Sequence, residues 1–202
     1  MPMKKNLLYG LLIISSLTLV SCSSTDASKG NVSTSKIVKK SANKMTKDEK
    51  MKNSLTNVKV GDFNKDGKAG SSKDEVVKLL GKETSVTKND TVETLIWKTG
   101  KVRIDVGFMN NKVVSKTITG FLYKRDKVIS LDDFDAIKTN TSYEIVTDKY
   151  GQPDELATTV MNGNELTTGV WYSNIKGEND KANMTLNFTD GKLTQKNQVG
   201  IK

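Results

Sequence analysis

Apolar and polar residues alternate with a period of two in two stretches of the chain, residues 101–108 and 182–189. This alternation predicts β-strands with one buried face and one face in water. The buried positions would be Val102, Ile104, Val106, Phe108, Ala182, Met184, Leu186 and Phe188. Short turn sequences at 109–112 and 189–192 lead into second alternating stretches at 113–119 and 193–198, so we expect two antiparallel hairpins.

A helical pattern precedes each strand region, at about residues 72–80 and 142–150. Ser72 and Ser142 are suited to cap these helices, because a hydroxyl can accept a hydrogen bond from a free backbone N–H of the first turn. Glu75 stands three residues after Ser72, which completes a capping box. Gly81 and Gly151 follow the last apolar position, where we expect the left-handed helix stop.

The two regions resemble each other in sequence as well as in pattern. Asp62-Phe63-Asn64 recurs as Asp133-Phe134-Asp135, and Trp97 corresponds to Trp171. Such self-similarity predicts a repeat architecture. We therefore expect an α+β fold made of two tandem repeats, residues 58–125 and 126–202, each with short helices packed on one face of a three- to four-stranded antiparallel sheet.

The N-terminus has the pattern of an export signal. Lys4 and Lys5 precede an apolar run at 7–20, which at about 14 residues is shorter than the roughly 20 that a permanent membrane span needs. The run ends in Leu19-Val20-Ser21-Cys22, which resembles a bacterial lipobox. That resemblance implies removal of a signal peptide, residues 1–21, and a diacylglycerol on Cys22 that anchors the protein to the outer face of the cell membrane.

Residues 22–57 are rich in Ser, Thr, Lys and Asn and contain no aromatic residue. Such a composition buries too little apolar surface to offset the entropy of ordering, so we expect a disordered, basic tether. Its lysines could lie on anionic lipid, or the segment could be a soluble spacer. A short helix at about 46–55 is the alternative for its last part.

Composition removes several classes of chemistry. The chain has no histidine and Cys22 is its only cysteine, which excludes catalytic triads that need histidine, intramolecular disulfides and thiolate zinc clusters. The net charge is +9, but the cations are mostly scattered lysines without interleaved aromatic residues, so we expect no nucleic-acid partner. We expect no enzyme activity and no cofactor beyond the covalent lipid.

The chain contains two acidic clusters. Asp62, Asn64 and Asp66 begin like a calcium loop, but position twelve is Lys73 in place of the usual glutamate. A plain turn is the favoured interpretation and calcium the weaker one. The second cluster, Asp132, Asp133 and Asp135, is compatible with a hydrolase, although helix capping is its simpler role.

Candidate contacts for a protein partner come from two groups. Trp97 and Trp171 occupy equivalent places, where shared packing is favoured over a role as binding anchors. Polar residues on the expected wet face of the sheet form the second group, although most residues of this kind are merely solvated. They are Arg103, Asp105, Lys116, Asn183, Thr185 and Asn187.

The repeated pattern of Phe63, a Ser72-Xaa-Xaa-Glu75 helix start, a glycine stop, a tryptophan and a Phe-Xaa-Asn/Asp-Asn/Gly-Lys hairpin resembles the β-lactamase inhibitor protein-like (BLIP-like, SmpA/OmlA-like) group. This group includes tandem-repeat lipoproteins of Gram-positive bacteria. The resemblance implies that the open sheet faces form a concave protein-binding surface. The inhibitor itself usually contains disulfides, which neither unit here can form.

These observations predict a surface lipoprotein that acts as a non-catalytic protein-binding module. The alternative is a structural envelope spacer that binds anionic wall polymer or lipid through its basic charge. A hydrolase is the third and least favoured function.

Overall fold

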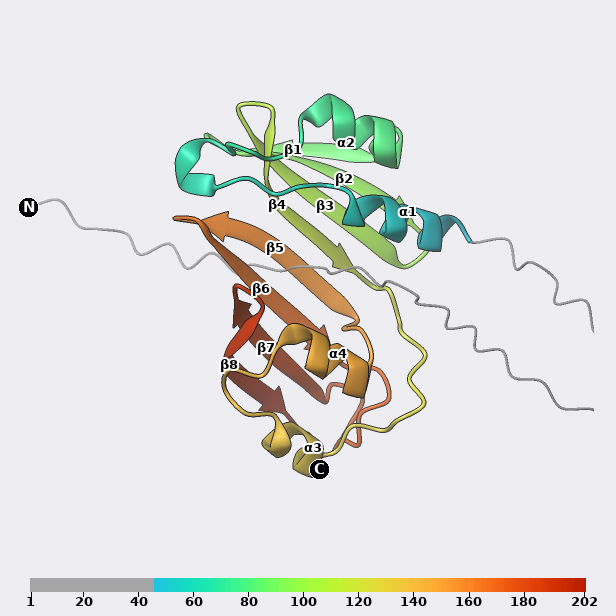
Figure 1. Ribbon diagram of the computed structural model, residues 1–202. Coiled ribbons are helices and arrows are strands. Elements are labelled where there is room, and N and C mark those ends of the chain that lie inside the picture. Colours follow the sequence, from blue (N-terminus) through green and yellow to red (C-terminus); the bar gives the residue numbers. More distant parts are fainter. Residues whose placement is uncertain (1–45) are drawn as a thin grey trace, which may run out of the picture.

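The computed structural model describes residues 46–202, which form a mostly β structure with short helices. The helices are α1 (Lys47–Thr56), the 3-10 turn η1 (Phe63–Lys65), α2 (Lys73–Leu80), α3 (Leu131–Ala136) and α4 (Tyr143–Tyr150). The strands are β1 (Ser85–Lys88), β2 (Glu93–Thr99), β3 (Val102–Met109), β4 (Lys112–Thr119), β5 (Glu155–Met161), β6 (Asn164–Trp171), β7 (Asn183–Thr189) and β8 (Lys192–Val199). Figure 1 shows α1 and α2 beside β1–β4, and α3 and α4 beside β5–β8.

All eight strands belong to one antiparallel sheet in the order β1 to β8. The expected fold of two tandem repeats, each with its own three- to four-stranded sheet, is therefore wrong. β4 pairs with β5 from Ser115↔Thr159 to Ile118↔Leu156, and we call this pairing the seam. Because each strand edge offers unpaired N–H and C=O groups, joining the two edges removes both of them from water.

The predicted hairpins of β3–β4 and β7–β8 are present, and each contains a β-bulge that the alternation did not reveal. The register shifts between Gly107 and Phe108 in one hairpin and between Asn187 and Phe188 in the other. A bulge adds one residue to a strand and so changes which side chains face the core. The turn residues Asn110 and Asn111 have positive φ angles of 48° and 62°, as a tight hairpin turn requires.

The helix starts are as predicted, whereas the helix stops differ in detail. Ser72 and Glu75 form the capping box of α2, and the hydroxyl of Ser142 accepts a hydrogen bond from the backbone N–H of Ile145 at the start of α4. Gly81 and Gly151 do have positive φ, but their ψ angles of −169° and 174° place them outside the left-handed helical region. Glycine is needed there because other residues rarely adopt that backbone conformation.

The helix α1 lies inside the segment that we expected to be a disordered tether. Thr46 and Glu49 form a capping box, and Met51 and Leu55 are buried in the core. α1 is thus packed against the described fold, although the expected tether extended to residue 57. A short helix was the alternative prediction for this segment. Its two apolar residues, Met51 and Leu55, stabilise the helix only because they pack against the sheet.

The predicted signal peptide, the predicted lipobox and the first part of the predicted tether lie outside the described residues. Within residues 46–202, no helix is long and apolar enough to cross a membrane.

Candidate functional site

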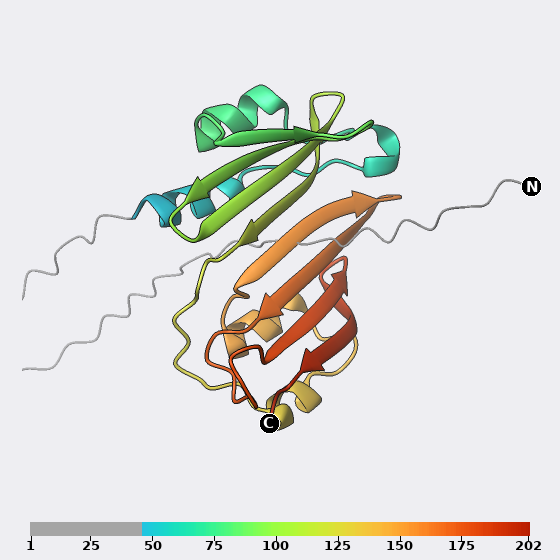
Figure 2. The same ribbon diagram turned by 180° about the vertical axis from the view of Figure 1, so that it is seen from behind.

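One face of the sheet carries the helices, which we call the helix face, and the other is the open face. Figure 2 shows the molecule from behind, where no helix covers the strands. The open face includes one continuous row of paired residues that crosses the sheet from β2 to β8. Its members in order are Ile96, Asp105, Thr117, Ala157, Thr168, Asn187 and Gln195.

Neutral polar groups dominate this row. The Thr168 hydroxyl donates to Asn187 Oδ1 at 2.6 Å, and Asn187 Nδ2 donates to Gln195 Oε1 at 3.4 Å. Arg103 Nε donates to both carboxylate oxygens of Asp105 at 2.9 Å. Hydroxyl and amide groups can exchange hydrogen bonds with a partner, and burying them costs less than burying charged groups, so the row is suited to recognition.

Five of the predicted contact residues lie on this open face. Arg103 and Asp105 come from β3, and Asn183, Thr185 and Asn187 come from β7. All five are partly exposed. The structure joins the β3 and β7 groups into one surface only because β4 and β5 pair between them.

Trp97 and Trp171 are not part of that surface. Their exposed fractions are 2% and 0%, and each indole Nε1 donates to a glycine carbonyl at 2.9 Å, Gly81 for Trp97 and Gly151 for Trp171. Buried indoles with a satisfied N–H are core residues. The structure therefore places both tryptophans as packing residues that hold the ends of α2 and α4, and not as exposed anchors.

Lys116 was expected on the wet face of the sheet, but it lies on the helix face. Lys116 is 7% exposed, and its Nζ donates to the backbone carbonyls of Val58 and Leu55 at 2.8 Å and 3.3 Å. The physical reason is the bulge of the β3–β4 hairpin, which pairs Val106 with Lys116 and so turns Lys116 toward the helix face. Burial lowers its pKa to about 8.

Asp62, the first candidate calcium ligand, binds backbone groups of the other half of the chain. Its carboxylate accepts hydrogen bonds from the backbone N–H groups of Asn162 at 3.2 Å and Gly163 at 2.9 Å, and Asn64 Nδ2 donates to Asn162 Oδ1 at 2.8 Å. Burial raises the pKa of Asp62, but the hydrogen bonds from Lys65 and from the N–H groups of Asn64 and Gly163 outweigh it and lower the pKa overall.

These contacts make the 62–64 turn a clamp on the β5–β6 hairpin. Asp66, the third candidate ligand, has the left-handed backbone typical of a turn residue. Within residues 46–202 no three Asp, Glu, His or Cys side chains are grouped as metal ligands.

The acidic cluster before the second half has the geometry of a helix cap. Ser130 and Asp133 form a capping box at the start of α3, and Asp133 Oδ1 lies 2.5 Å from Lys127 Nζ. Burial raises the pKa of Asp133, but hydrogen bonds from Lys127 and Ser130 outweigh it, so the pKa falls. Asp132 lies in the same first turn, where its charge faces the positive end of the helix.

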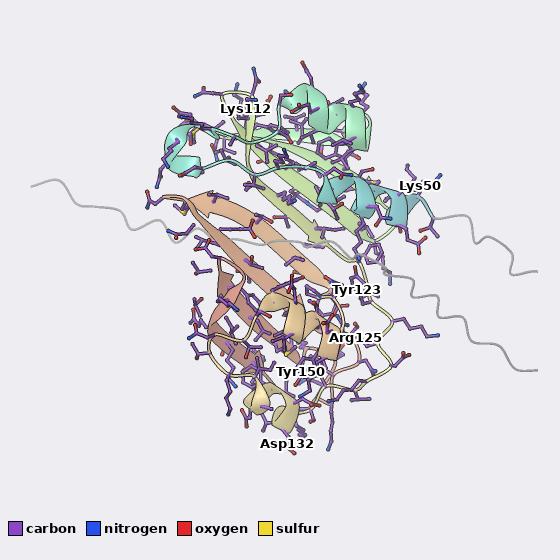
Figure 3. All side chains as sticks on the ribbon, in the orientation of Figure 1. Lys50, Lys112, Tyr123, Arg125, Asp132 and Tyr150 are labelled. Atoms are coloured by element: carbon purple, nitrogen blue, oxygen red, sulfur yellow. The ribbon has the colours of Figure 1, made fainter. Side chains whose placement is uncertain are left out.

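The structure contains a buried ion pair that was not predicted from the sequence. Arg125 Nη1 lies 2.9 Å from Asp154 Oδ2, and both side chains are almost fully buried. Asp154 also accepts from the backbone N–H groups of Tyr123, Tyr172 and Ser173 at 2.8–3.0 Å. Figure 3 shows Arg125 between Tyr123 and Tyr150. One signal was available: Arg103 and Arg125 are the chain's only arginines, and arginine is preferred over lysine in buried, multiply hydrogen-bonded pairs.

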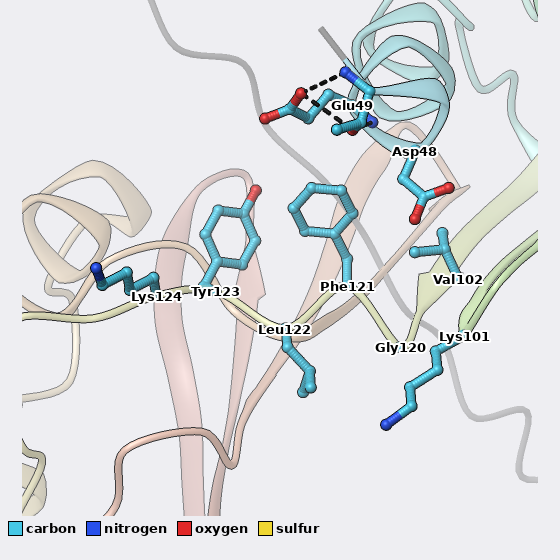
Figure 4. A pocket seen from close by; sticks show the side chains of 10 residues that line it. Asp48, Glu49, Lys101, Val102, Gly120, Phe121, Leu122, Tyr123 and Lys124 are labelled. Atoms are coloured by element: carbon cyan, nitrogen blue, oxygen red, sulfur yellow. Dashed lines mark hydrogen bonds between the residues drawn. The ribbon is translucent and has the colours of Figure 1, made fainter. Parts of the chain in front are cut away.

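A hollow of about 620 Å³ lies between the start of α1 and the segment 120–124 that leaves β4 (Figure 4). The rings of Phe121 and Tyr123 form part of its wall. Lys52 Nζ from α1 lies 4.5 Å and 3.9 Å from the centres of these two rings, which is within cation–π range. The two rings thus already bind the ammonium group of Lys52, and this contact holds α1 against the segment 120–124, which we call the linker.

One solved structure shares this architecture. The crystal structure of a "putative beta-lactamase inhibitor protein" from Streptococcus mutans has 24% sequence identity and a TM-score of 0.62, over 76% of this chain and 97% of that chain. This similarity shows a shared fold and supports the resemblance seen in the sequence. An extracellular protein with an SCP domain from Bacillus anthracis is 14% identical with a TM-score of 0.27, over 65% of this chain and 43% of that chain.

No curated protein matches the sequence. The name of the Streptococcus mutans protein indicates an inhibitor, and no enzyme family matches the chain. A family model described as a domain of unknown function with a solved structure (DUF3862) matches residues 47–201. This segment is more than half of the chain, and the protein therefore belongs to the DUF3862 family.

Proposed function

We propose that this protein is a non-catalytic protein-binding module and that its open face is the contact surface. The observation that carries the proposal is the row of paired residues on the open face, in which Thr117, Thr168, Asn187 and Gln195 supply hydroxyl and amide groups and no helix lies over the strands. A continuous sheet positions these groups rigidly, so a partner can bind without ordering flexible loops. The fold shared with the Streptococcus mutans protein supports a binding role.

The module is anchored at the outer face of the cell membrane of a Gram-positive bacterium through a diacylglycerol on Cys22. The export signal and the lipobox Leu19-Val20-Ser21-Cys22 support this part of the proposal. Two or more acyl chains hold a protein on a bilayer far more firmly than one chain does. Such an anchor would keep the binding surface close to envelope proteins.

Site-specific photo-crosslinking in intact cells tests the contact surface. A photoreactive residue replaces Thr185 on the open face in one variant and the exposed Ile145 on α4 in a control variant. We expect a discrete crosslinked protein from position 185 and none from position 145. The same products from both positions, or none from either, would argue against the open face.

The net charge of +9 favours a second function, that of an envelope spacer which binds anionic wall polymer. Binding of purified wall polymer by the full chain distinguishes the two functions. A spacer would bind polymer strongly at low salt and release it at about 1 M salt, where the Debye length is only about 3 Å. A protein contact made through hydrogen bonds on the open face would survive that salt concentration.

A further inference from the structure

A cavity of about 300 Å³ lies on the helix face at the seam, away from the open face. Lys116 of β4, Thr158 of β5 and Glu165 of β6 line it, together with Val58, Lys59 and Val60 from the segment after α1. Lys116 and Thr158 are directly paired across the seam. The cavity therefore exists only because the two halves of the chain share one sheet. We call it the seam cavity.

Two buried polar side chains in the seam cavity have unused hydrogen-bonding capacity. Lys116 Nζ has three N–H donors, of which two bind the carbonyls of Leu55 and Val58. Within residues 46–202, no carboxylate lies within ion-pair distance of this ammonium group. Thr158 is 3% exposed, and its hydroxyl has no hydrogen-bond partner in the described part of the chain. Groups of this kind are normally satisfied, and leaving them unpaired costs stability.

The charge of the lining indicates what would satisfy these groups. Lys59 and Lys116 contribute two positive charges, whereas Glu165 contributes one negative charge and lies on an exposed part of β6. A carboxylate can accept hydrogen bonds from the ammonium and the hydroxyl together, and it would add a negative charge in direct contact with Lys116, whose only electrostatic support among the lining residues is the more distant Glu165. The volume is at the lower end of the range for small-molecule sites.

We propose that the seam cavity binds a small molecule through a carboxylate group, which accepts hydrogen bonds from Lys116 Nζ and the Thr158 hydroxyl. Glu165 lines the same cavity, and its carboxylate would pair with an amino group if the molecule carries one. The ligand is therefore either a simple carboxylic acid or an amino acid. This site is independent of the contact surface on the open face, so failure of one proposal leaves the other standing.

NMR titration of the full chain in detergent, with acetate, glycine and methylammonium as probes, tests the proposal. We expect saturable shifts at Thr158 and Lys116 with acetate or glycine and none with methylammonium. Tighter binding of glycine than of acetate would identify an amino acid as the ligand, and equal or weaker binding would identify a simple acid. The absence of saturation with either anion up to tens of millimolar would overturn the proposal.

Variants separate binding from folding. Thr158→Val removes the hydroxyl at nearly constant volume, and we expect about three- to tenfold weaker binding from the loss of one hydrogen bond. Thr167→Val is the matched control, because Thr167 pairs with Thr158 on β6 but does not line the cavity. Lys116→Met should abolish binding. An equal loss in both threonine variants, or unchanged binding in Thr158→Val, would also overturn the site.

Discussion

The side chains of Arg125 and Asp154 show how strongly single residues can depend on one another in this fold. Asp154 accepts hydrogen bonds from Arg125, from the Ser173 hydroxyl at 2.6 Å and from three backbone N–H groups. Arg125 Nε donates in turn to the carbonyl of Tyr150 at 3.1 Å. The pair thereby joins the linker after β4 to the ends of α4 and β6, and each charge is compensated only while the other is present.

Asp154→Ala should therefore lower the free energy of unfolding by about 3–5 kcal/mol, because it leaves the Arg125 charge buried without its partner. Chemical denaturation monitored by tryptophan fluorescence measures the change. Asp105→Ala is the control, since it removes a carboxylate whose arginine partner is partly exposed, and it should cost about 0–1 kcal/mol. Equal losses in the two variants would contradict the buried network.

Lys116 makes stability depend on pH in an identifiable direction. Its pKa falls from 10.5 to about 8 on folding, so between these values the unfolded chain binds more protons than the folded one. The free energy of unfolding should therefore rise between about pH 8 and 10. Lys52, whose pKa also falls to about 8 through burial, contributes in the same window.

Denaturation curves of Lys116→Met, Lys52→Met and the double variant separate these contributions. We expect each single variant to reduce the rise in stability with pH and the double variant to reduce it further. Lys149→Met is the control, because Lys149 has a raised pKa and cannot produce a rise in this window. An unchanged slope in the double variant would exclude both lysines as its source.

Among the elements, α1 has the role least expected from its own composition. Its residues are largely polar, yet Leu55 is fully buried. The backbone carbonyl of Leu55 also accepts a hydrogen bond from Lys116 Nζ of β4. α1 has no basic residue in its last turn, so Lys116 provides the positive charge that a helix C-terminus favours. Docking on the sheet therefore stabilises a helix that would be marginal in isolation.

Leu55→Ala should cost about 2–5 kcal/mol, the usual range for a leucine removed from a packed core. Ile145→Ala on α4 is the matched control, because Ile145 is 60% exposed and its truncation should be nearly neutral. Thermal unfolding of both variants checks the difference. A neutral Leu55→Ala would mean that α1 belongs to the tether after all.

The sheet as a whole depends on the seam and on contacts that cross it. β4 and β5 pair over four residues, the Thr159 hydroxyl donates to the carbonyl of Val114, and Asp62 binds the turn at Asn162 and Gly163. These contacts come from segments far apart in the chain. They should couple the two halves into one cooperative unit.

Single-tryptophan variants test this coupling. Trp171→Phe leaves Trp97 as the reporter of the first half, and Trp97→Phe leaves Trp171 as the reporter of the second. In each variant we expect the fluorescence transition to coincide with loss of the circular dichroism signal of the whole sheet. A fluorescence midpoint that differs clearly from the circular dichroism midpoint of the same variant would show that the halves unfold separately.

Local features could be predicted from the sequence because they depend on neighbouring residues. The cap of α2 at Ser72 and Glu75 and the turn at Asn110 and Asn111 were found in this way, and so were the open-face positions of Arg103 and Asp105. Lys116 could not be placed, because a bulge reverses the alternation and has no clear signature in the sequence. The equivalent places of Trp97 and Trp171 favoured shared packing over a role as binding anchors, and the structure shows that both are buried.

The sequence by itself determined the helix starts, the hairpins, the internal similarity and the absence of histidine chemistry, since propensity, periodicity and composition act over a few residues. Only the tertiary structure decided that β4 and β5 pair, that Arg125 meets Asp154, and that Lys116 and Thr158 share a cavity. Each of these contacts joins residues 29 or more positions apart. Such contacts form because an unpaired strand edge and a buried charge each need a partner. The partner comes from a distant part of the chain, so the local sequence pattern does not identify it.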